Sequence, residues 1–181
     1  LNPKPQVAAT EDMMIPVSGT KIAIRLYRPE PKGAPLPALV FMHASGYVFG
    51  DLDTSDSFCR LLATGAHCMV IAVDYRRAPE YKFPGPIEDC YQAALWVAEH
   101  ANEIGVDPAR LAVGGESSGG TMATVVAQLA AERGKPSLCH QVLWYPGTGS
   151  LGPTASSQNY GEGYFLENSL QAWSVGHYLN D

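Results

Sequence analysis

The sequence predicts an α/β fold in which a mostly parallel sheet is flanked by helices. Nearly continuous apolar runs at residues 36–42 and 69–73 are typical of strands that are buried on both faces, and residues 140–145 predict a further apolar strand. Apolar residues at helical spacing lie between these runs, at residues 57–66 and 86–104. Because strands and helices alternate along the chain, we expect right-handed crossovers that place helices on both faces of the sheet.

Two further elements of this core follow from local signals. Residues 21–28 alternate polar and apolar side chains, which predicts a half-exposed antiparallel strand. The helix over 86–104 is expected to end at Gly105, because glycine favours a helix C-terminus and Asp107-Pro108 follows.

The pattern changes after Pro146. Residues 147–160 are rich in Gly, Ser, Thr and Pro and predict a loop. Residues 166–179 predict a short helix. The side chains expected on one face of that helix are Leu170, Trp173 and His177.

Composition and charge restrict the classes of partner. A net charge of −6 argues against nucleic acid and anionic membranes as partners. The sequence contains no apolar run of the roughly 18 residues that a membrane helix needs, and no signal peptide opens it. We therefore expect a cytoplasmic protein that acts on a small molecule, and a homodimer is left open as its assembly.

The cysteines suggest neither a metal site nor a redox motif. They are widely spaced, with no C-x-x-C and no cluster with histidine, so we expect reduced thiols, no metal and no cofactor. The sequence alone leaves all three disulfide pairings open. The four residues are Cys59, Cys68, Cys90 and Cys139.

The most informative motif is the pentapeptide at 115–119, Gly-Glu-Ser-Ser-Gly. It follows a predicted strand at 110–114 and opens a predicted helix at 119–132, which is the context of a G-x-S-x-G nucleophile elbow. So sharp a turn requires strained backbone at Ser117 and nearly no side chain two residues away on either side. Gly115 and Gly119 meet that requirement. Ser117 is therefore the predicted nucleophile.

A second loop follows a buried strand and converges on the same place. His43-Ala44-Ser45-Gly46 comes directly after residues 36–42, where its backbone N–H groups can point toward the elbow. Together with residues 74–80 (Asp-Tyr-Arg-Arg-Ala-Pro-Glu) and 115–120, this loop resembles the hormone-sensitive-lipase-like branch of the α/β-hydrolases. That branch shows H-G-G-G, D-Y-R-L-A-P-E and G-D-S-A-G-G in this order, and the resemblance runs from about Met14 to the last residue.

The resemblance implies an α/β-hydrolase fold with a partial helical lid, and hydrolysis of short-to-medium acyl esters without a cofactor. Ser117 matches the family's nucleophile. Ser45 and Gly46 match the third and fourth positions of H-G-G-G, whose N–H groups form the oxyanion hole in the family, and Ser118 supplies a third N–H. The departures are Ala44 and Ser45, which stand where the family has glycine. A left-handed backbone angle at either residue would cost about 1–2 kcal/mol.

The resemblance also implies a division of the chain. Residues 1–13 are expected to be a remnant of an N-terminal lid, 14–146 the N-terminal part of the hydrolase core, and 147–181 a lid segment. In this fold the acid and the histidine of the triad follow the serine, each after a further βαβ unit of about 30 residues. The C-terminal part of the fold is therefore expected to be missing here, with both residues beyond position 181. A substitute triad from Glu167 and His177 is disfavoured, because a lid helix is no rigid strand end.

Other readings of the sequence stay open. Plant gibberellin receptors resemble the same family and bind a ligand without hydrolysing it, so a non-catalytic receptor is the first alternative. An amidase or peptidase on this fold is the second. His43 is expected to shape its loop by bonding to backbone, Glu116 to anchor the elbow, and Asp74 and Arg76 to join an ion-pair network.

Overall fold

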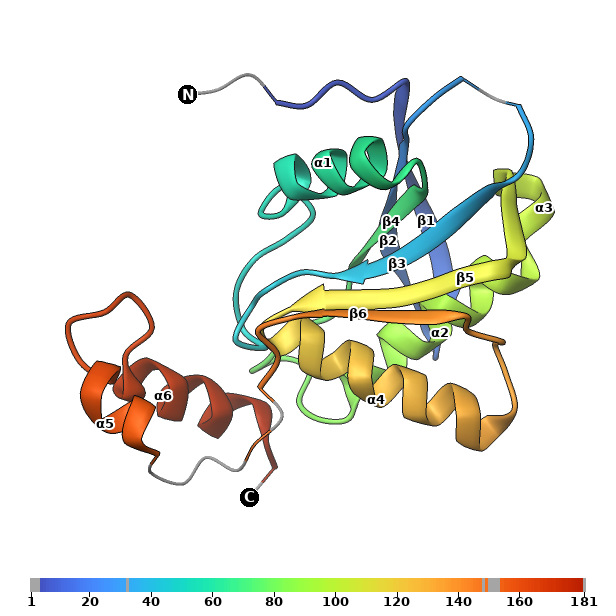
Figure 1. Ribbon diagram of the computed structural model, residues 1–181. Helices are drawn as coiled ribbons and strands as arrows, with labels where there is room; N and C mark the ends of the chain where they lie inside the picture. The colour runs from blue at the N-terminus through green and yellow to red at the C-terminus, as the bar shows by residue number, and fades with distance from the viewer. Residues whose placement is uncertain (1–3, 32, 148, 150–153, 181) are drawn as a thin grey trace.

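The computed structural model describes residues 4–31, 33–147, 149 and 154–180. A six-stranded sheet runs through it in the order β1-β2-β4-β3-β5-β6 (Figure 1). The strands are β1 (Ala9–Val17), β2 (Thr20–Arg28), β3 (Leu36–Met42), β4 (Met69–Asp74), β5 (Val106–Glu116) and β6 (His140–Trp144). The helices are α1 (Asp56–Ala66), α2 (Gly85–Glu99), α3 (Ala101–Ile104), α4 (Ser118–Arg133), α5 (Ala155–Tyr160) and α6 (Asn168–Tyr178).

Parallel pairing dominates the sheet. β4, β3, β5 and β6 pair in parallel, whereas β2 pairs antiparallel with both β1 and β4. The predicted α/β architecture is confirmed, and so is the antiparallel strand expected at residues 21–28.

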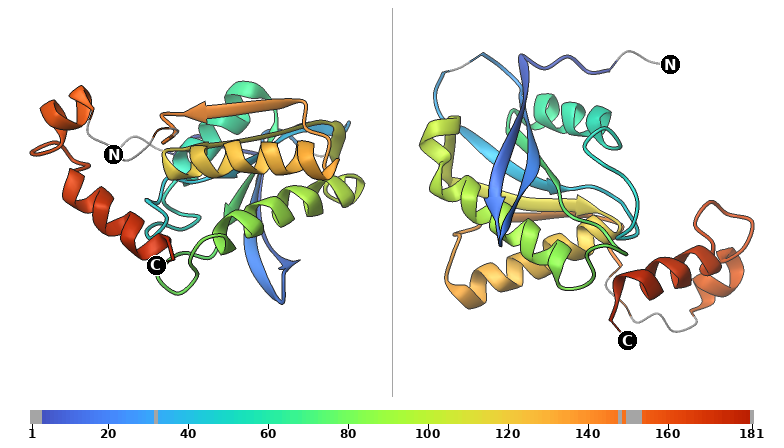
Figure 2. Two further views of the ribbon diagram at one scale, coloured as in Figure 1. Left: turned by 90° about the horizontal axis from the view of Figure 1, so that it is seen from below. Right: turned by 180° about the vertical axis from the view of Figure 1, so that it is seen from behind.

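Helices cover both faces of the sheet. α1 lies on one face, and α2 and α4 lie on the other (Figures 1 and 2). The buried core is divided in the same way: Cys59 and Ala63 of α1 pack with Phe41 on one side, while Met122 and Val126 of α4 belong to the larger cluster on the other. α5 and α6 lie beyond the carboxyl ends of β3 and β5, apart from the layered core.

Strand β1 is not visible in the sequence pattern. It lies at the edge of the sheet, and only Ile15 and Val17 of its side chains are buried. Met14 is 59% exposed, so the strand lacks the apolar run that marks a central strand. The boundary that the sequence placed after residue 13 falls inside this strand.

The helix boundaries differ in two places. The expected helix at 86–104 is divided at His100 into α2 and α3, although it ends at Gly105, whose φ of 72° is left-handed. The expected loop at 147–160 contains α5, so that prediction is wrong for its last residues. The Thr154 side chain caps α5 by accepting a bond from the Ser157 N–H, and the Ser157 side chain accepts one from the Thr154 N–H. This capping box has serine in place of the usual Glu or Gln, so the sequence pattern does not reveal it.

The helix expected at 166–179 is present as α6, and two of its residues are buried. Ser174 and Tyr178 are its buried residues. Leu170 and Trp173, which were expected to share one face, are 37% and 48% exposed, so that face is not the docking face.

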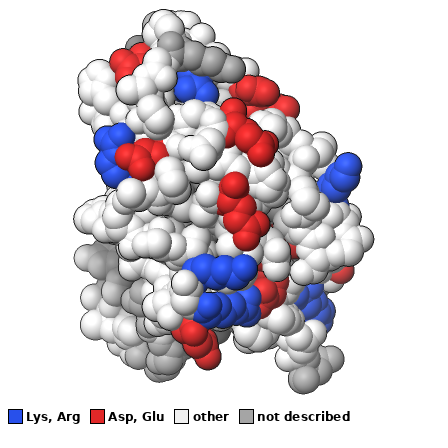
Figure 3. Space-filling model, turned by 90° about the vertical axis from the view of Figure 1, so that its right-hand side faces the viewer, with Lys and Arg blue, Asp and Glu red and all other residues white. Residues whose placement is uncertain are grey.

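The thiols, the helix lengths and the distribution of charge complete the description of the fold. All four cysteines are free thiols, three of them buried and Cys139 exposed. Within the described ranges no helix is both long and apolar enough to cross a bilayer, and no group of three or more His, Cys, Asp or Glu could hold a metal ion. On the face shown in Figure 3, basic and acidic side chains are interspersed rather than gathered into one basic surface.

Candidate active site

Ser117 occupies a sharp turn between β5 and α4. Its backbone angles are φ 52° and ψ −121°, a region that residues with a Cβ rarely adopt. Such a conformation costs about 1–3 kcal/mol and persists only where the surroundings enforce it. The strained serine that the G-x-S-x-G context predicts is therefore present in the structure.

Close approach of the backbone explains the glycines on either side. A Cβ on Gly115 would lie 2.5 Å from the Met42 carbonyl oxygen at the end of β3. A Cβ on Gly119 would overlap the same carbonyl oxygen and would lie 2.6 Å from that of His43. Both positions therefore require glycine, because the start of α4 packs directly on the end of β3.

Hydrogen bonds hold the turn from the side of β6. The Ser117 N–H donates to the Trp144 carbonyl at 3.0 Å, and the Thr121 N–H donates to the Ser117 carbonyl at 3.0 Å. The Glu116 carboxylate accepts a bond from the Tyr145 hydroxyl and a longer one, 3.4 Å, from Ser55. The bond to Glu116 raises the pKa of Tyr145 to about 12. Glu116 thus links β5 to its surroundings, as an anchor would.

The loop after β3 places its left-handed angles where the sequence did not predict them. They fall on Gly46, with φ 53°, and on Tyr47, with φ 69°. Ala44 and Ser45 do not have positive φ, so neither residue bears the cost of a left-handed angle. The strain of this loop lies instead on Tyr47, one residue beyond the motif.

Two serines connect this loop to the elbow. The Ser45 N–H donates to the Ser118 hydroxyl at 3.1 Å, and the two hydroxyls are 3.0 Å apart. The Tyr47 N–H donates to the Ser45 hydroxyl at 2.8 Å. The loop and the first residue of α4 therefore form one hydrogen-bonded unit.

His43 shapes the base of this loop. Its Nδ1 lies 3.1 Å from the Ala44 carbonyl oxygen, and its ring stacks on Tyr75 with centroids 4.5 Å apart. The Tyr75 hydroxyl donates to the His43 carbonyl at 2.7 Å. Burial lowers the pKa of His43, which favours a neutral ring. These contacts suit a structural residue, as the sequence indicates.

The expected ion-pair network is two separate pairs. Arg76 binds Asp89 of α2 at 2.7 Å, and Arg77 binds Asp74 at 2.6 Å. Arg76 also lies over the ring of Tyr81, 4.6 Å from its centroid. The segment after β4 is thus tied to α2, next to the loop after β3, since the Ala78 N–H donates to the Tyr47 carbonyl at 3.0 Å.

A pocket of about 290 Å³ opens above Ser117, between the elbow, the loop after β3 and α6. Three of the predicted site residues line it together, and Ser45 lies behind them, 6% exposed. No charged side chain of the described residues lines the pocket. Its lining residues are Gly46, Tyr47, Ser117, Ser118, Thr121, Gly147, Gly149, Leu166, Gln171, Ser174, Val175, Tyr178 and Leu179.

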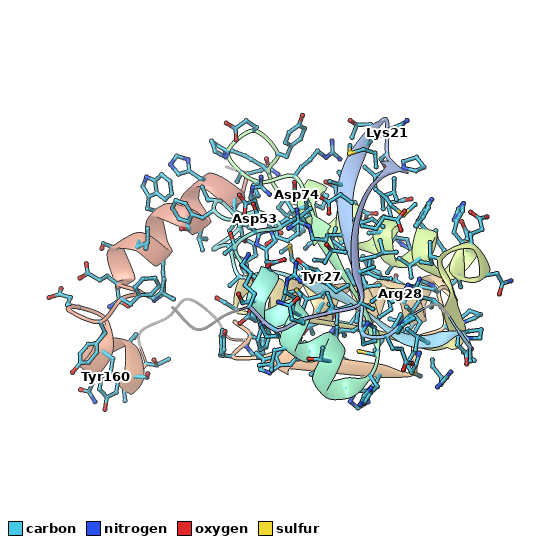
Figure 4. The ribbon with its side chains drawn as sticks, turned by 90° about the horizontal axis from the view of Figure 1, so that it is seen from above. Lys21, Tyr27, Arg28, Asp53, Asp74 and Tyr160 are labelled. Carbon is cyan, nitrogen blue, oxygen red and sulfur yellow. The ribbon has the colours of Figure 1, made fainter. Side chains whose placement is uncertain are left out.

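Helix α6, within the segment expected to be a lid, forms one wall of the pocket, and sequence reasoning missed only the residues that dock it. Tyr178 stacks on Tyr47, and its carbonyl accepts a bond from the Phe83 N–H at 2.8 Å. Asn180 donates to the Phe83 carbonyl at 2.7 Å. Tyr160, in α5, lies at the far end of this segment from the sheet (Figure 4). The four-residue spacing of Ser174 and Tyr178 is the one signal that could have identified the docking face.

None of the five histidines lines the described pocket. His140 begins β6, at the opposite end of the strand from Trp144, and His177 packs edge-on against Trp173 at 4.3 Å. Glu167 accepts a bond from the Gly163 N–H at 3.2 Å and does not line the pocket. The described residues therefore bring a serine and backbone donors together, without a histidine or carboxylate beside them.

Comparison with known proteins gives a consistent result. A family model for the alpha/beta hydrolase fold matches residues 39–181. Esterase LipI of Mycobacterium tuberculosis is 46% identical over 76% of this chain and 43% of its own length. The carboxylic ester hydrolase LipN of the same organism is 42% identical over 99% of this chain and 49% of its own length. The chain spans about half the length of these curated relatives.

Solved structures agree in fold. A thermostable carboxylesterase cloned from a metagenomic library matches with a TM-score of 0.93 and 46% identity, over 97% of this chain and 60% of its own. A hyperthermophilic esterase from Pyrobaculum calidifontis matches with a TM-score of 0.92 and 42% identity, over 98% of this chain and 59% of its own. The comparisons agree with the resemblance that the three motifs indicate.

Proposed function

Because the chain belongs to the alpha/beta hydrolase fold family, we propose that its protein is a carboxylic-ester hydrolase with Ser117 as nucleophile. The observation that supports this most strongly is the strained backbone of Ser117, at φ 52°, in a pocket it shares with Gly46 and Ser118. Relatives described as esterases support it independently. The three motifs support the hormone-sensitive-lipase-like branch.

In the proposed reaction the Ser117 oxygen bonds to the ester carbonyl carbon while its proton passes to a general base. The carbonyl π electrons move to the oxygen, and backbone N–H groups stabilise the resulting oxyanion. Collapse of this intermediate expels the alcohol, which takes the proton, and water then hydrolyses the acyl-enzyme by the same steps.

The geometry assigns different parts to the three predicted oxyanion residues. The N–H groups of Gly46 and Ser118 belong to residues that line the pocket with Ser117. The Ser45 N–H instead donates to the Ser118 hydroxyl. We therefore propose Gly46 and Ser118 as the donors to the oxyanion, with Ser45 supporting them from behind.

The general base is proposed to come from outside these 181 residues. The support is that neither histidine nor carboxylate of the described residues lines the pocket. The 181-residue chain alone should then show negligible turnover, because loss of the base costs several orders of magnitude in such triads. Near-normal turnover by this chain would instead assign the base to His140 or His177.

The test uses the full-length protein and a fluorophosphonate probe. We expect mass spectrometry to find the adduct on Ser117 alone, and Ser117→Ala to lower kcat for p-nitrophenyl butyrate by about 10⁴-fold or more. Ser137→Ala, an exposed serine outside the pocket, is the matched control and should change neither readout. A protein that binds esters without labelling or turnover would be a non-catalytic receptor, and an adduct on another serine would overturn the assignment.

A further inference from the structure

The hydroxyls of Ser45 and Ser118 form a buried bridge between two segments that are distant in sequence. Their oxygens are 3.0 Å apart, and the residues are only 6% and 5% exposed. One hydroxyl belongs to the loop after β3 and the other to the first residue of α4. The bridge therefore joins the two segments that carry the proposed oxyanion donors.

Each hydroxyl also binds a backbone N–H group. Ser118 Oγ accepts from the Ser45 N–H at 3.1 Å, and Ser45 Oγ accepts from the Tyr47 N–H at 2.8 Å. Loss of the acceptor of a buried N–H group destabilises the arrangement that contains it. The two serines thus fix the backbone on both sides of Gly46. Because glycine has no Cβ, Gly46 itself adopts its φ of 53° with little restraint.

The two serines are also paired departures from the motifs that the chain resembles. The third position of H-G-G-G and the fourth position of G-D-S-A-G-G carry no hydroxyl, whereas this chain has one at each. Neither hydroxyl could form the bridge without the other. Their direct contact explains why both occur together.

We propose that the Ser45–Ser118 hydroxyl bridge is a positioning device that sets the Gly46 N–H relative to the Ser118 N–H. This inference rests on the proposed esterase activity. It assigns the side chains of Ser45 and Ser118 as positioning groups, which act through backbone donors and do not touch the reacting atoms. A misplacement of about 1 Å in such donors can cost up to 10²-fold in rate, so the effect should be on kcat.

The experiment is a double-mutant cycle in the full-length protein with Ser45→Ala, Ser118→Ala and the double variant. Alanine removes only the hydroxyl, and position 45 has no left-handed angle that would strain it. We expect each single variant to lower kcat for p-nitrophenyl butyrate about tenfold, with KM changed less than about threefold. The double variant should lose no more than either single variant, because both substitutions break the same bridge.

A second readout separates positioning from stability. The affinity for an aryl trifluoromethyl ketone, which forms a tetrahedral adduct with the serine, should fall in parallel with kcat. Thr124→Ala on α4 is the matched control: its hydroxyl bonds only within the helix, to the Gly120 carbonyl at 3.0 Å, so kcat should be unchanged. Thermal melting should show the parent and all four variants folded at the assay temperature.

Three results would overturn the bridge. The first is a Ser118→Ala variant that is faster than the parent, which would mean that the hydroxyl withholds the Ser45 N–H from the oxyanion. The second is a double variant whose loss in kcat equals the two single losses combined. The third is a loss confined to KM. Should a single variant fail to fold, the double variant still tests the proposal, since its kcat and its ketone affinity should fall together while KM changes little. Failure of the proposed function looks different, since the parent itself would then neither turn over esters nor label at Ser117.

Discussion

The rings of Tyr47 and Tyr178 stack face to face, with centroids 4.0 Å apart and planes 8° from parallel. Tyr47 follows Gly46 in the loop after β3, and Tyr178 ends α6. The contact therefore joins the segment 154–180 to the loop that carries a proposed oxyanion donor. No other pair of rings in the described residues lies as close.

The stack predicts opposite outcomes for two substitutions of Tyr178. The Tyr178 hydroxyl is buried and finds no partner within the described residues, and its burial raises the pKa. Tyr178→Phe keeps the stack and removes the unpaired hydroxyl, so docking of α6 should be unchanged or tighter. Tyr178→Ala should release α6, which amide hydrogen exchange over residues 168–178 would report as faster exchange. Equal exchange in the two variants would show that the stack does not hold the helix.

A matched pair of glycine substitutions tests the elbow. Gly115→Ala should destabilise the fold by about 3 kcal/mol or more, because rigid backbone surrounds the new Cβ. Gly65 of α1 has no atom within 4 Å of an added Cβ and no positive φ. Gly65→Ala should therefore be neutral or stabilise the helix by up to about 1 kcal/mol. Urea unfolding of both variants measures the contrast, and similar free energies for the two would contradict the close packing.

The sequence was sufficient wherever the signal is local. β3 and β4 are buried and carry their own apolar runs, and the elbow is marked by the spacing of its glycines, so the positions of β3, β4 and Ser117 were predictable. β6 was also located, although it is an edge strand with no buried residue. Strand β1 was not, because an edge strand that buries only Ile15 and Val17 has no such run. The Ser45–Ser118 bridge was also out of reach, since the contact joins residues 73 positions apart and neither serine signals it alone.

Asp56 at the start of α1 is the centre of a charge cluster. Its side chain is 3% exposed and accepts Lys4 Nζ at 2.7 Å and Arg60 Nε at 3.0 Å, with Arg25 Nη1 at 3.8 Å. Burial by itself would raise the pKa of Asp56, but the bonds from Lys4 and Arg60 outweigh it and hold the pKa below its usual value.

This shift predicts how stability depends on pH. Because the folded pKa is depressed, the unfolded chain takes up the proton first as the pH falls, and the stabilisation present above about pH 4 is lost as the pH passes through the folded pKa. Asp56→Asn should cost about 1–3 kcal/mol at pH 7 and much less at pH 3. Urea unfolding at the two pH values measures this. Asp107→Asn, in the exposed pair with Arg110, is the control and should change little. A loss for Asp56→Asn that is as large at pH 3 as at pH 7 would refute the linkage.

The size of the pocket predicts a preference for short acyl chains. Its volume, about 290 Å³, lies at the lower limit of the range that binds drug-sized ligands. Apolar pockets discriminate by about 1–3 kcal/mol for each misfitting methylene, so butyrate esters should be hydrolysed far faster than palmitate esters. The measurement is kcat/KM of the full-length protein across p-nitrophenyl esters of increasing length. A profile that rises to the longest chain, with activation at a lipid interface, would indicate a true lipase.

The backbone of Ser117 also bears on how such a protein can evolve. At φ 52° and ψ −121° glycine is favoured over every residue that has a Cβ. Replacement by glycine would relieve strain of about 1–3 kcal/mol and remove the nucleophile in a single step. Selection for hydrolysis alone keeps a serine there. In a lineage selected only for binding a ligand, mutation of Ser117 to glycine would stabilise the fold. The strain at this turn therefore favours the evolution of a binding protein from a hydrolase, and disfavours the return to serine.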